Sequence, residues 1–270
     1  MRDEQSGLTT MLAYGVGGAL LLALIVYMVF APKEVSLDPT TFCPRSADQS
    51  SPRTTVIVVD RTDPITEVQQ QDIRGYVSDA LRNALPRERF VIYALDARKD
   101  IVLDGKVRCN PLGPKANGLL AELSDDKSFD AKRFKEQFLD PMVAKVATLL
   151  PTATTTQTDS PIMELIQAVA VRDLKRSPKG RLILISDLMQ HSARYSQYRA
   201  APNFDAFARS VAFKELAVDL SNTDVEVLYI TRTQGPSHQP PEHIEFWHRY
   251  FSALRANSIL IRAVRGEGWK

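Results

Sequence analysis

The chain has 270 residues, of which 44% are hydrophobic and 24% are charged. This composition is that of a folded chain and excludes an intrinsically disordered one. The formal net charge is only +2, from 34 basic and 32 acidic residues, so we expect no nucleic-acid partner.

An uncharged N-terminal segment is the clearest feature of the chain. No charged side chain occurs between Glu4 and Lys33, and residues 11–31 are nearly all apolar. About 20 apolar residues in a helix span the roughly 30 Å hydrocarbon core of a bilayer, whereas a cleaved signal peptide has a shorter apolar run. We therefore predict a tail over residues 1–10 and one transmembrane helix over residues 11–31, which makes this a single-pass membrane protein.

The segment after this helix bears on the compartment. Residues 32–53 are rich in Pro, Ser, Thr and Asp, and we expect a linker there. The basic residues on the two sides of the helix barely differ in number, so they do not decide its orientation. Cys43 and Cys109 can form a disulfide in an oxidising compartment, or remain two free thiols. A disulfide favours a periplasmic or other extracytoplasmic domain, with the cytoplasm as the alternative.

Residues 54–270 alternate strand and helix patterns. We predict strands at residues 54–60, 90–95, 101–109, 181–187, 225–230 and 258–264. Helices are predicted after the first strand, where Ile73, Val77, Leu81 and Leu85 repeat every four residues, and at residues 129–150, 160–174, 204–220 and 242–256. Pro141 should kink or split the second of these helices, and Trp247 should lie in the core.

This alternation predicts the fold class and the position of a site. We expect an α/β domain with a Rossmann-like, open and mostly parallel sheet, covered by helices on both faces. The connection between the second and third strands is too short for a helix, so these strands should form an antiparallel hairpin at one edge. Asp60 and Asp187 end the two most apolar strands, and ligands of such sheets bind outside the strands' carboxyl ends. Both aspartates are therefore predicted to face one crevice.

Three segments of this domain resemble the motifs of von Willebrand factor type A domains. They are Asp60-Arg61-Thr62, then Ser160-Pro161-Ile162 with Glu164-Leu165 at a helix start, and then Ser186-Asp187 after a central strand. The resemblance spans roughly residues 54–264 and implies a metal-ion-dependent adhesion site, in which a bound ion takes a carboxylate from a partner protein. Two positions depart from the family pattern, with Pro64 where a second hydroxyl is usual and Leu188 where Gly is common.

Carried over by position, the resemblance implies four ligands of a Mg²⁺ ion, held directly or through water: Asp60, Thr62, Ser160 and Asp187. Such oxygen ligands suit Mg²⁺. Pro64 has no side-chain ligand to offer, so the site is expected to be degenerate. The alternative is that these residues cap loops: Asp60 and Thr62 the loop after the first strand, Asp187 the amides of its own loop.

The residues beside these positions are candidates for contact with a partner. They are Asp63, Met189, His191, Arg194, Tyr195 and Tyr198. Tyr and Arg are over-represented at the energetic centres of interfaces. The alternative is a surface loop whose aromatic residues pack against one another.

The sequence supports three hypotheses about function. The first is a membrane-anchored module that binds a protein partner through the crevice, with Mg²⁺ as its cofactor, within a bacterial-type membrane or envelope complex. The second is a metal-assisted hydrolase of the phosphoesterase kind that uses the same aspartates. The third is a structural subunit of a membrane assembly with a vestigial site. No nucleophile elbow, P-loop or dinucleotide fingerprint occurs, so we expect no enzyme.

Overall fold

The computed structural model describes residues 18, 21–22, 25–26, 36–45, 51–95, 102–112, 127–151, 159–199, 202–232 and 239–264, with no account of the side chains of residues 102–105 and 127–129. The chain divides into two units, Met1–Ser36 and Leu37–Lys270. The predicted span at residues 11–31 lies almost entirely outside the described residues. Within the described ranges, no helix has both the length and the apolarity needed to cross a bilayer. The transmembrane helix therefore stays a prediction.

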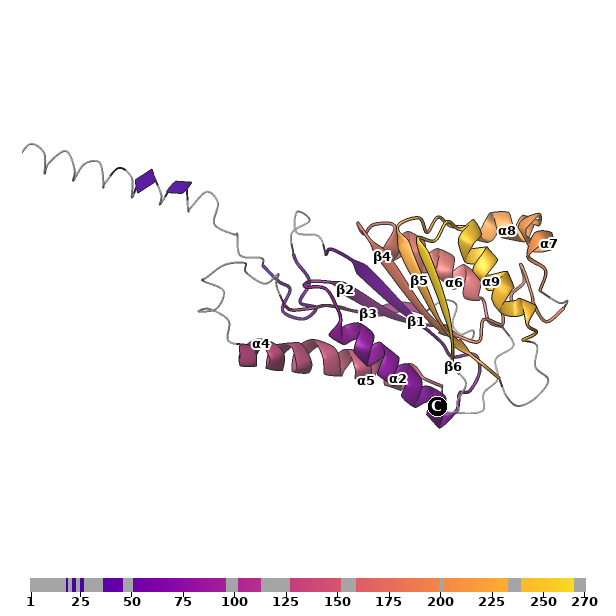
Figure 1. Ribbon diagram of the computed structural model, residues 1–270, viewed down its shortest axis with the longest axis horizontal. Coiled ribbons are helices and arrows are strands. Elements are labelled where there is room, and N and C mark those ends of the chain that lie inside the picture. The colour runs from indigo at the N-terminus through magenta and orange to yellow at the C-terminus, as the bar shows by residue number, and fades with distance from the viewer. Residues whose placement is uncertain are drawn as a thin grey trace, which may run out of the picture. The chain divides into compact units, whose positions relative to one another are not determined.

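One six-stranded sheet forms the centre of the second unit, in the order β3-β2-β1-β4-β5-β6 (Figure 1). The strands are β1 (Thr54–Asp60), β2 (Arg89–Leu95), β3 (Val102–Cys109), β4 (Gly180–Ser186), β5 (Thr223–Ile230) and β6 (Ser258–Val264). All neighbouring pairs are parallel except β2 and β3, which are antiparallel. The predicted mostly parallel sheet with an antiparallel edge hairpin is confirmed.

Helices cover both faces of the sheet (Figure 1). One face carries α2 (Glu67–Arg82), α4 (Lys127–Phe134) and α5 (Asp140–Leu149), and the other carries α6 (Ile162–Val169), α7 (Phe204–Ala208), α8 (Val211–Leu216) and α9 (Glu242–Ala253). Successive side chains of β1 point to opposite faces, so Val56 and Val58 join the core under α6 and α9, while Ile57 and Val59 join the core under α2 and α5. Trp247 of α9 is fully buried, as predicted.

Two predicted helices differ in detail from those observed. The helix containing Pro141 continues through a π-helical turn, η3 (Lys135–Leu139), and the proline lies in the first turn of α5, where a missing N–H is tolerated. A second π-helical turn, η4 (Ala170–Leu174), extends α6. The single helix predicted over residues 204–220 is wrong, because Ser210 caps a new helix there by accepting a hydrogen bond from the Phe213 amide.

The stripe predicted along α2 is also one residue too long. The helix starts with a capping box formed by Thr66 and Gln69, and it ends at Arg82, with Asn83 as its C-cap. Ile73, Val77 and Leu81 are fully buried, whereas Leu85 lies beyond the helix and is 40% exposed. Leu85 keeps the four-residue spacing of the stripe, but it lies past the end of the helix, where the spacing no longer directs a side chain toward the core.

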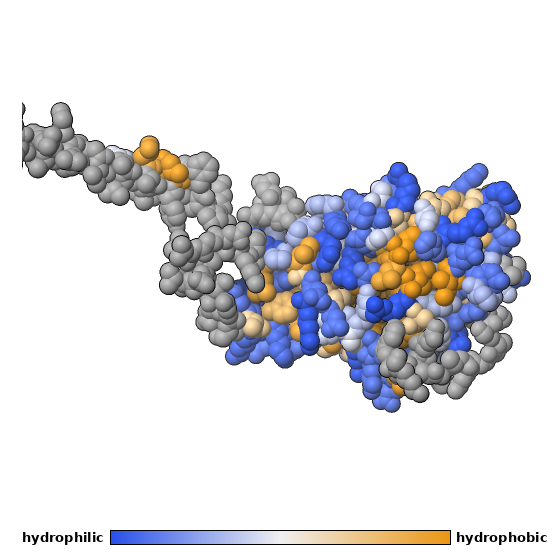
Figure 2. All heavy atoms as spheres, in the orientation of Figure 1, coloured by the Kyte–Doolittle hydropathy of each residue, from blue (hydrophilic) through white to orange (hydrophobic). Residues whose placement is uncertain are grey.

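The β6 edge of the sheet is apolar at the surface. Figure 2 shows an apolar patch in this region, surrounded by hydrophilic residues. Leu260 of β6 is 48% exposed, and Ile259 and Ile261 are half-buried against the core. β6 pairs with β5 alone among the strands that the structure describes, so its outer backbone edge is open.

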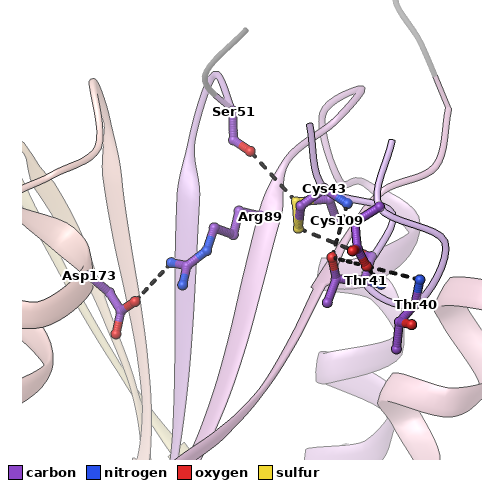
Figure 3. Close-up of a disulfide and its surroundings, with 8 residues drawn as sticks. Thr40, Thr41, Cys43, Ser51, Arg89, Cys109 and Asp173 are labelled. Atoms are coloured by element: carbon purple, nitrogen blue, oxygen red, sulfur yellow. Dashed lines mark hydrogen bonds and ion pairs between the residues drawn. A yellow bond between two sulfur atoms is a disulfide. The ribbon is translucent and has the colours of Figure 1, made fainter. Parts of the chain in front are cut away.

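A disulfide ties the start of the domain to the sheet. Cys43 and Cys109 are bonded, across 66 residues of sequence (Figure 3). The Cys109 amide also donates to the Thr41 carbonyl oxygen, at 2.8 Å, and Asp38 accepts hydrogen bonds from the amides of Thr40 and Thr41. Part of the predicted linker, residues 37–44, is therefore docked on β3 and belongs to the domain.

Candidate functional site

The crevice lies where the order of the strands reverses. β1 and β4 are neighbours, and from this point the chain continues outward to β2 and β3 on one side and to β5 and β6 on the other. The register pairs Val59 with Ile185, so Asp60 lies beside Ser186, and Asp187 follows directly. Open α/β sheets bind ligands at such a switch point, outside the carboxyl ends of the strands.

Asp60 organises the first side of the crevice. One of its carboxylate oxygens accepts hydrogen bonds from the Thr62 amide, at 3.0 Å, and from the Thr62 hydroxyl, at 2.7 Å. The other oxygen accepts from the Ser186 hydroxyl, at 2.7 Å. Burial in apolar surroundings raises the pKa of Asp60, and these hydrogen bonds oppose the rise.

Ser160 joins this group from the start of α6. Its hydroxyl oxygen lies 3.4 Å from the hydroxyl oxygen of Thr62. Ser160 does not cap the helix, because α6 begins at Ile162 with Pro161 at the cap position. Instead, two backbone hydrogen bonds with His191, of 2.8 and 2.9 Å, fix Ser160 against the loop after β4.

Asp187 occupies a tight turn after β4. Its carboxylate accepts a hydrogen bond from the Met189 amide at 3.0 Å, and the Leu188 amide donates to the Ser186 hydroxyl at 2.8 Å. Leu188 has a φ of 61°, in the left-handed region that costs a non-glycine residue roughly 1–2 kcal/mol. The turn thus keeps the backbone form that favours the family's glycine, and the complete burial of the Leu188 side chain offsets the cost.

Arg232 completes the crevice from the end of β5. Its Nε donates to a carboxylate oxygen of Asp187 at 2.5 Å. Its Nη2 forms ion pairs with the carboxylates of both Asp187 and Asp63. Burial disfavours the charged guanidinium, but the carboxylates of Asp187 and Asp63 outweigh this effect and raise the pKa of Arg232.

The same surroundings act on Asp187. Burial and repulsion by Asp60 raise its pKa to about 6, although the positive charge of Arg232 opposes the rise. The four predicted ligands are all buried, with exposures of 5% or less: Asp60, Thr62, Ser160 and Asp187. The structure brings these four side chains to one end of the sheet.

A cavity of about 320 Å³ opens beside these side chains. Its wall is formed by the ends of β1, β4 and β5 and the start of α2, namely Asp60, Thr62, Asp63, Pro64, Ile65, Thr66, Gln69, Asp187, Ile230, Thr231 and Arg232. Among these lining residues, three are acidic and one is basic. The described part of the crevice therefore carries a negative net charge.

The arrangement does not fit the predicted Mg²⁺ site. Across the described part of the chain, no three side chains of the His, Cys, Asp and Glu types are grouped so as to hold a metal ion. The predicted site has only two such side chains, Asp60 and Asp187, and takes its other two ligands from hydroxyl groups, so the geometry around Asp187 decides whether an ion fits. The guanidinium of Arg232 contacts Asp187 where an ion would need that carboxylate, and Pro64 contributes no ligand. The alternative prediction, that Asp60 and Asp187 bind loop groups, describes the hydrogen bonds observed.

The candidate partner residues have different environments. Tyr198 is 42% exposed, and its ring lies 5.4 Å from the half-buried His191 ring. Arg194 is exposed and forms ion pairs with Glu164, at 3.7 Å, and Glu215, at 3.3 Å.

Two of these candidates point into the core instead. Met189 is buried, with 1% exposure, so its side chain offers no surface. The Tyr195 ring packs 4.3 Å from the Phe207 ring, in the aromatic cluster between α7 and α9. For Tyr195, the structure therefore shows the local aromatic packing that was the alternative to a partner contact.

Sequence reasoning missed Arg232 and Gln239. Arg232 is the second residue after β5, the strand next to β4. The strand-end argument that selected Asp60 and Asp187 applies equally to that position. A lone arginine in a polar segment carries no motif that would single it out.

Known proteins resemble this chain in structure and not in sequence. No protein-family model matches it, and no protein of described function matches it in sequence. One solved structure that aligns is a von Willebrand factor type A protein from Catenulispora acidiphila, at 16% identity and a TM-score of 0.40, over 80% of this chain and 39% of that one.

Two further structures align at the same level. The ArnB paralog VWA2 from Sulfolobus acidocaldarius has 10% identity and a TM-score of 0.37, over 82% of this chain and 44% of its own. The human COPII-coat protein Sec24c has 12% identity and a TM-score of 0.38, over 80% of this chain and 30% of its own. This chain spans less than half the length of each. Similarity this low does not establish kinship.

Proposed function

We propose that this chain is a protein-binding module of the von Willebrand factor type A kind, whose crevice at the carboxyl ends of β1, β4 and β5 engages a partner protein. The observation that carries the proposal is the convergence of Asp60, Thr62, Ser160 and Asp187 at the switch point of the sheet, beside a cavity of about 320 Å³. These four positions come from separate segments, and they match the three motifs of the family in order.

Binding is favoured over catalysis by the state of the two buried carboxylates. Asp60 accepts hydrogen bonds from Thr62 and Ser186, and Asp187 accepts from Met189 and Arg232. A general base needs an oxygen directed at its substrate, and a two-metal hydrolase needs several acidic or His ligands. Here the carboxylates serve to position the surrounding loops, so we do not carry the hydrolase hypothesis further.

The charge of the crevice indicates which chemical group of the partner it would bind. Three carboxylates and one guanidinium line its described wall, so a basic or neutral hydrogen-bonding group of the partner is favoured there over a carboxylate. Burial raises the pKa of Tyr198 to about 12, and the charges of Asp187 and Arg232 also act on it, so this side chain lies near the crevice. It forms an exposed aromatic rim of the kind enriched in interfaces.

The proposed location is the extracytoplasmic face of a membrane, with residues 11–31 as the anchor. The disulfide between Cys43 and Cys109 supports this, because disulfides persist in oxidising compartments and are rare in the cytosol. The anchor would hold the crevice close to other membrane components.

Site-specific photo-crosslinking in membranes tests the proposal. A photoreactive amino acid replaces Tyr198 at the rim, and in a matched variant it replaces Val211, which is 69% exposed at the start of α8. We expect a discrete adduct from position 198 and not from position 211, identified by mass spectrometry. The adduct should weaken when Asp60→Asn and Asp187→Asn are introduced together.

Two outcomes would contradict the proposal. One is an adduct of the same size and yield from both positions, which would indicate non-specific contact. The other is an adduct from position 198 that persists in the double variant while its circular dichroism and melting temperature match those of the natural chain. The crevice would then not be the binding site.

A structural subunit with a vestigial site remains the second candidate. The ion pairs of Arg232 with Asp63 and Asp187 favour it, since they engage the Asp187 carboxylate that a bound ion would need. Replacing residues 11–31 with an unrelated spanning helix distinguishes the two functions. Loss of complex assembly with an unchanged crevice would support the structural role.

A further inference from the structure

A side chain of the chain itself pairs with the aspartate that an ion in this crevice would need. An adhesion site of this family holds a cation between the carboxylates at the ends of β1 and β4. Here the guanidinium of Arg232 contacts Asp187 through Nε, at 2.5 Å, and through Nη2, which also reaches Asp63. A positive group therefore already pairs with the aspartate of the third motif segment and with Asp63, which directly follows the first segment.

Arg232 is held in place by its backbone. Its amide donates to the side-chain oxygen of Gln239 at 2.9 Å, and the Gln239 amide group donates in turn to the carbonyl oxygens of Asp187 and Ile230, at 3.1 and 2.9 Å. The residue before it is fixed as well, because the Gln69 side chain donates to the carbonyl oxygens of Thr231 and Val264. Groups from α2, β4, β5 and β6 thus position the arginine.

The charges of the crevice explain why a cation is needed there. Asp60 and Asp187 are both 5% exposed, and their like charges repel each other. A buried carboxylate without a counter-charge costs several kcal/mol. Arg232 supplies one positive charge and directional donors that match carboxylate geometry, whereas an ion would require Asp187 to give up these bonds.

Pro64 is an independent sign of the same change. It stands where the family pattern has a second hydroxyl ligand, and it lines the same cavity. The two features are complementary: a missing ligand weakens the binding of a metal ion, and a fixed guanidinium supplies the positive charge that the ion would otherwise provide.

We infer that Arg232 is a built-in replacement for the metal ion, and that the crevice of this chain is closed to divalent cations. Partner binding then does not depend on Mg²⁺ or Mn²⁺. The inference concerns the crevice alone, so it holds or fails separately from the proposed protein partner.

Direct measurement of Mn²⁺ binding to the purified full-length chain in detergent tests the inference. Free Mn²⁺ is followed by its electron paramagnetic resonance signal during titration. We expect no saturable site in the natural chain. In the variant Arg232→Ala with Asp63→Asn, which removes the guanidinium together with one carboxylate and so limits repulsion, we expect one Mn²⁺ site at least about tenfold tighter than any binding by the natural chain.

Two further variants make the result specific. Adding Asp187→Asn to that variant should abolish the new site. The matched control is Arg181→Ala with Glu226→Gln, which removes another arginine–carboxylate pair, at 2.7 Å, on the sheet next to α2. It should gain no Mn²⁺ site.

The inference is overturned by either of two results. One is saturable Mn²⁺ binding by the natural chain that Asp187→Asn abolishes. The other is a folded Arg232→Ala, Asp63→Asn variant, verified by circular dichroism, that gains no site. If that variant does not fold, the single change Arg232→Gln gives the same readout, since it removes the positive charge and keeps a side chain of similar polarity.

Discussion

Loss of the disulfide should destabilise the domain by a predictable amount. The bond between Cys43 and Cys109 closes a loop with a sequence separation of 66 residues. In the chain-entropy model, a loop of this length stabilises the folded state by about 4 kcal/mol, through restriction of the unfolded chain. For a domain of this size, that corresponds to a fall in melting temperature of roughly 8–16 °C.

Cys43→Ser is the better substitution for this test. Cys43 is half-buried, whereas Cys109 is fully buried, so replacing Cys109 would also lose packing. The docked segment keeps other contacts in the variant, including the hydrogen bond from the Cys109 amide to Thr41 and the hydrogen bonds accepted by Asp38. The folded state should therefore survive with its native spectrum.

Urea unfolding of the full-length chain in detergent measures the effect, with the fluorescence of the buried Trp247 as the signal. The natural chain is compared with and without a reductant, and Cys43→Ser under the same two conditions. We expect the reductant to lower the midpoint of the natural chain to that of the variant and to leave the variant unchanged. Equal midpoints for the oxidised natural chain and the variant would refute the reasoning, and would remove the main support for an extracytoplasmic domain.

Three other predictions concern the packing of the domain. Burial lowers the pKa of His243 to about 4, below its unfolded value near 6.5, so the unfolded state binds more protons between these two values and stability falls as the pH drops from 6.5 to 4. The variant His243→Gln should lose about 3 kcal/mol less stability over this pH range than the natural chain, measured as the unfolding free energy of each chain at both ends of the range. A Cβ at Gly180 would lie 2.5 Å from the Thr223 hydroxyl oxygen, so Gly180→Ala should lower the unfolding free energy by about 1–3 kcal/mol in urea unfolding. Adding Thr223→Ala to Gly180→Ala should recover part of this loss, and equal stability of the single and the double variant would contradict the clash. Arg53→Ala should cost about 3–5 kcal/mol, because it leaves the fully buried Glu88 carboxylate without its bidentate partner, and the further change Glu88→Gln should restore stability in the same assay if the unpaired charge is the cause.

The crevice shows how a family resemblance and a local structure can disagree. The four predicted ligand positions converge as the resemblance implies, yet the guanidinium of Arg232 pairs with the carboxylates of Asp187 and Asp63. A site that is organised without a metal ion keeps its shape when the supply of ions changes. Its affinity for a partner would then respond to ionic strength and to the charge of the partner, through the net negative charge of the crevice.

The sequence by itself determined the sheet and the main lines of the site. Runs of apolar, β-branched residues such as Thr54–Asp60 form strands that are buried on both faces, so the positions of these strands can be predicted from the local sequence alone. A short connection between β2 and β3 allows only an antiparallel hairpin. Asp60 and Asp187 were found because the carboxyl ends of parallel strands meet at one edge.

Only the tertiary structure decided what occupies the crevice. Arg232 reaches Asp187 across 45 residues of sequence, and its position depends on Gln239 and Gln69, which come from two other elements. Likewise, Tyr195 is partly buried because its ring packs against Phe207 of α7 and Phe246 of α9, whereas Tyr198 of the same polar loop is exposed. Strand formation is governed by neighbours along the chain, but the filling of a charged crevice depends on side chains brought together from distant segments, and no local pattern records that.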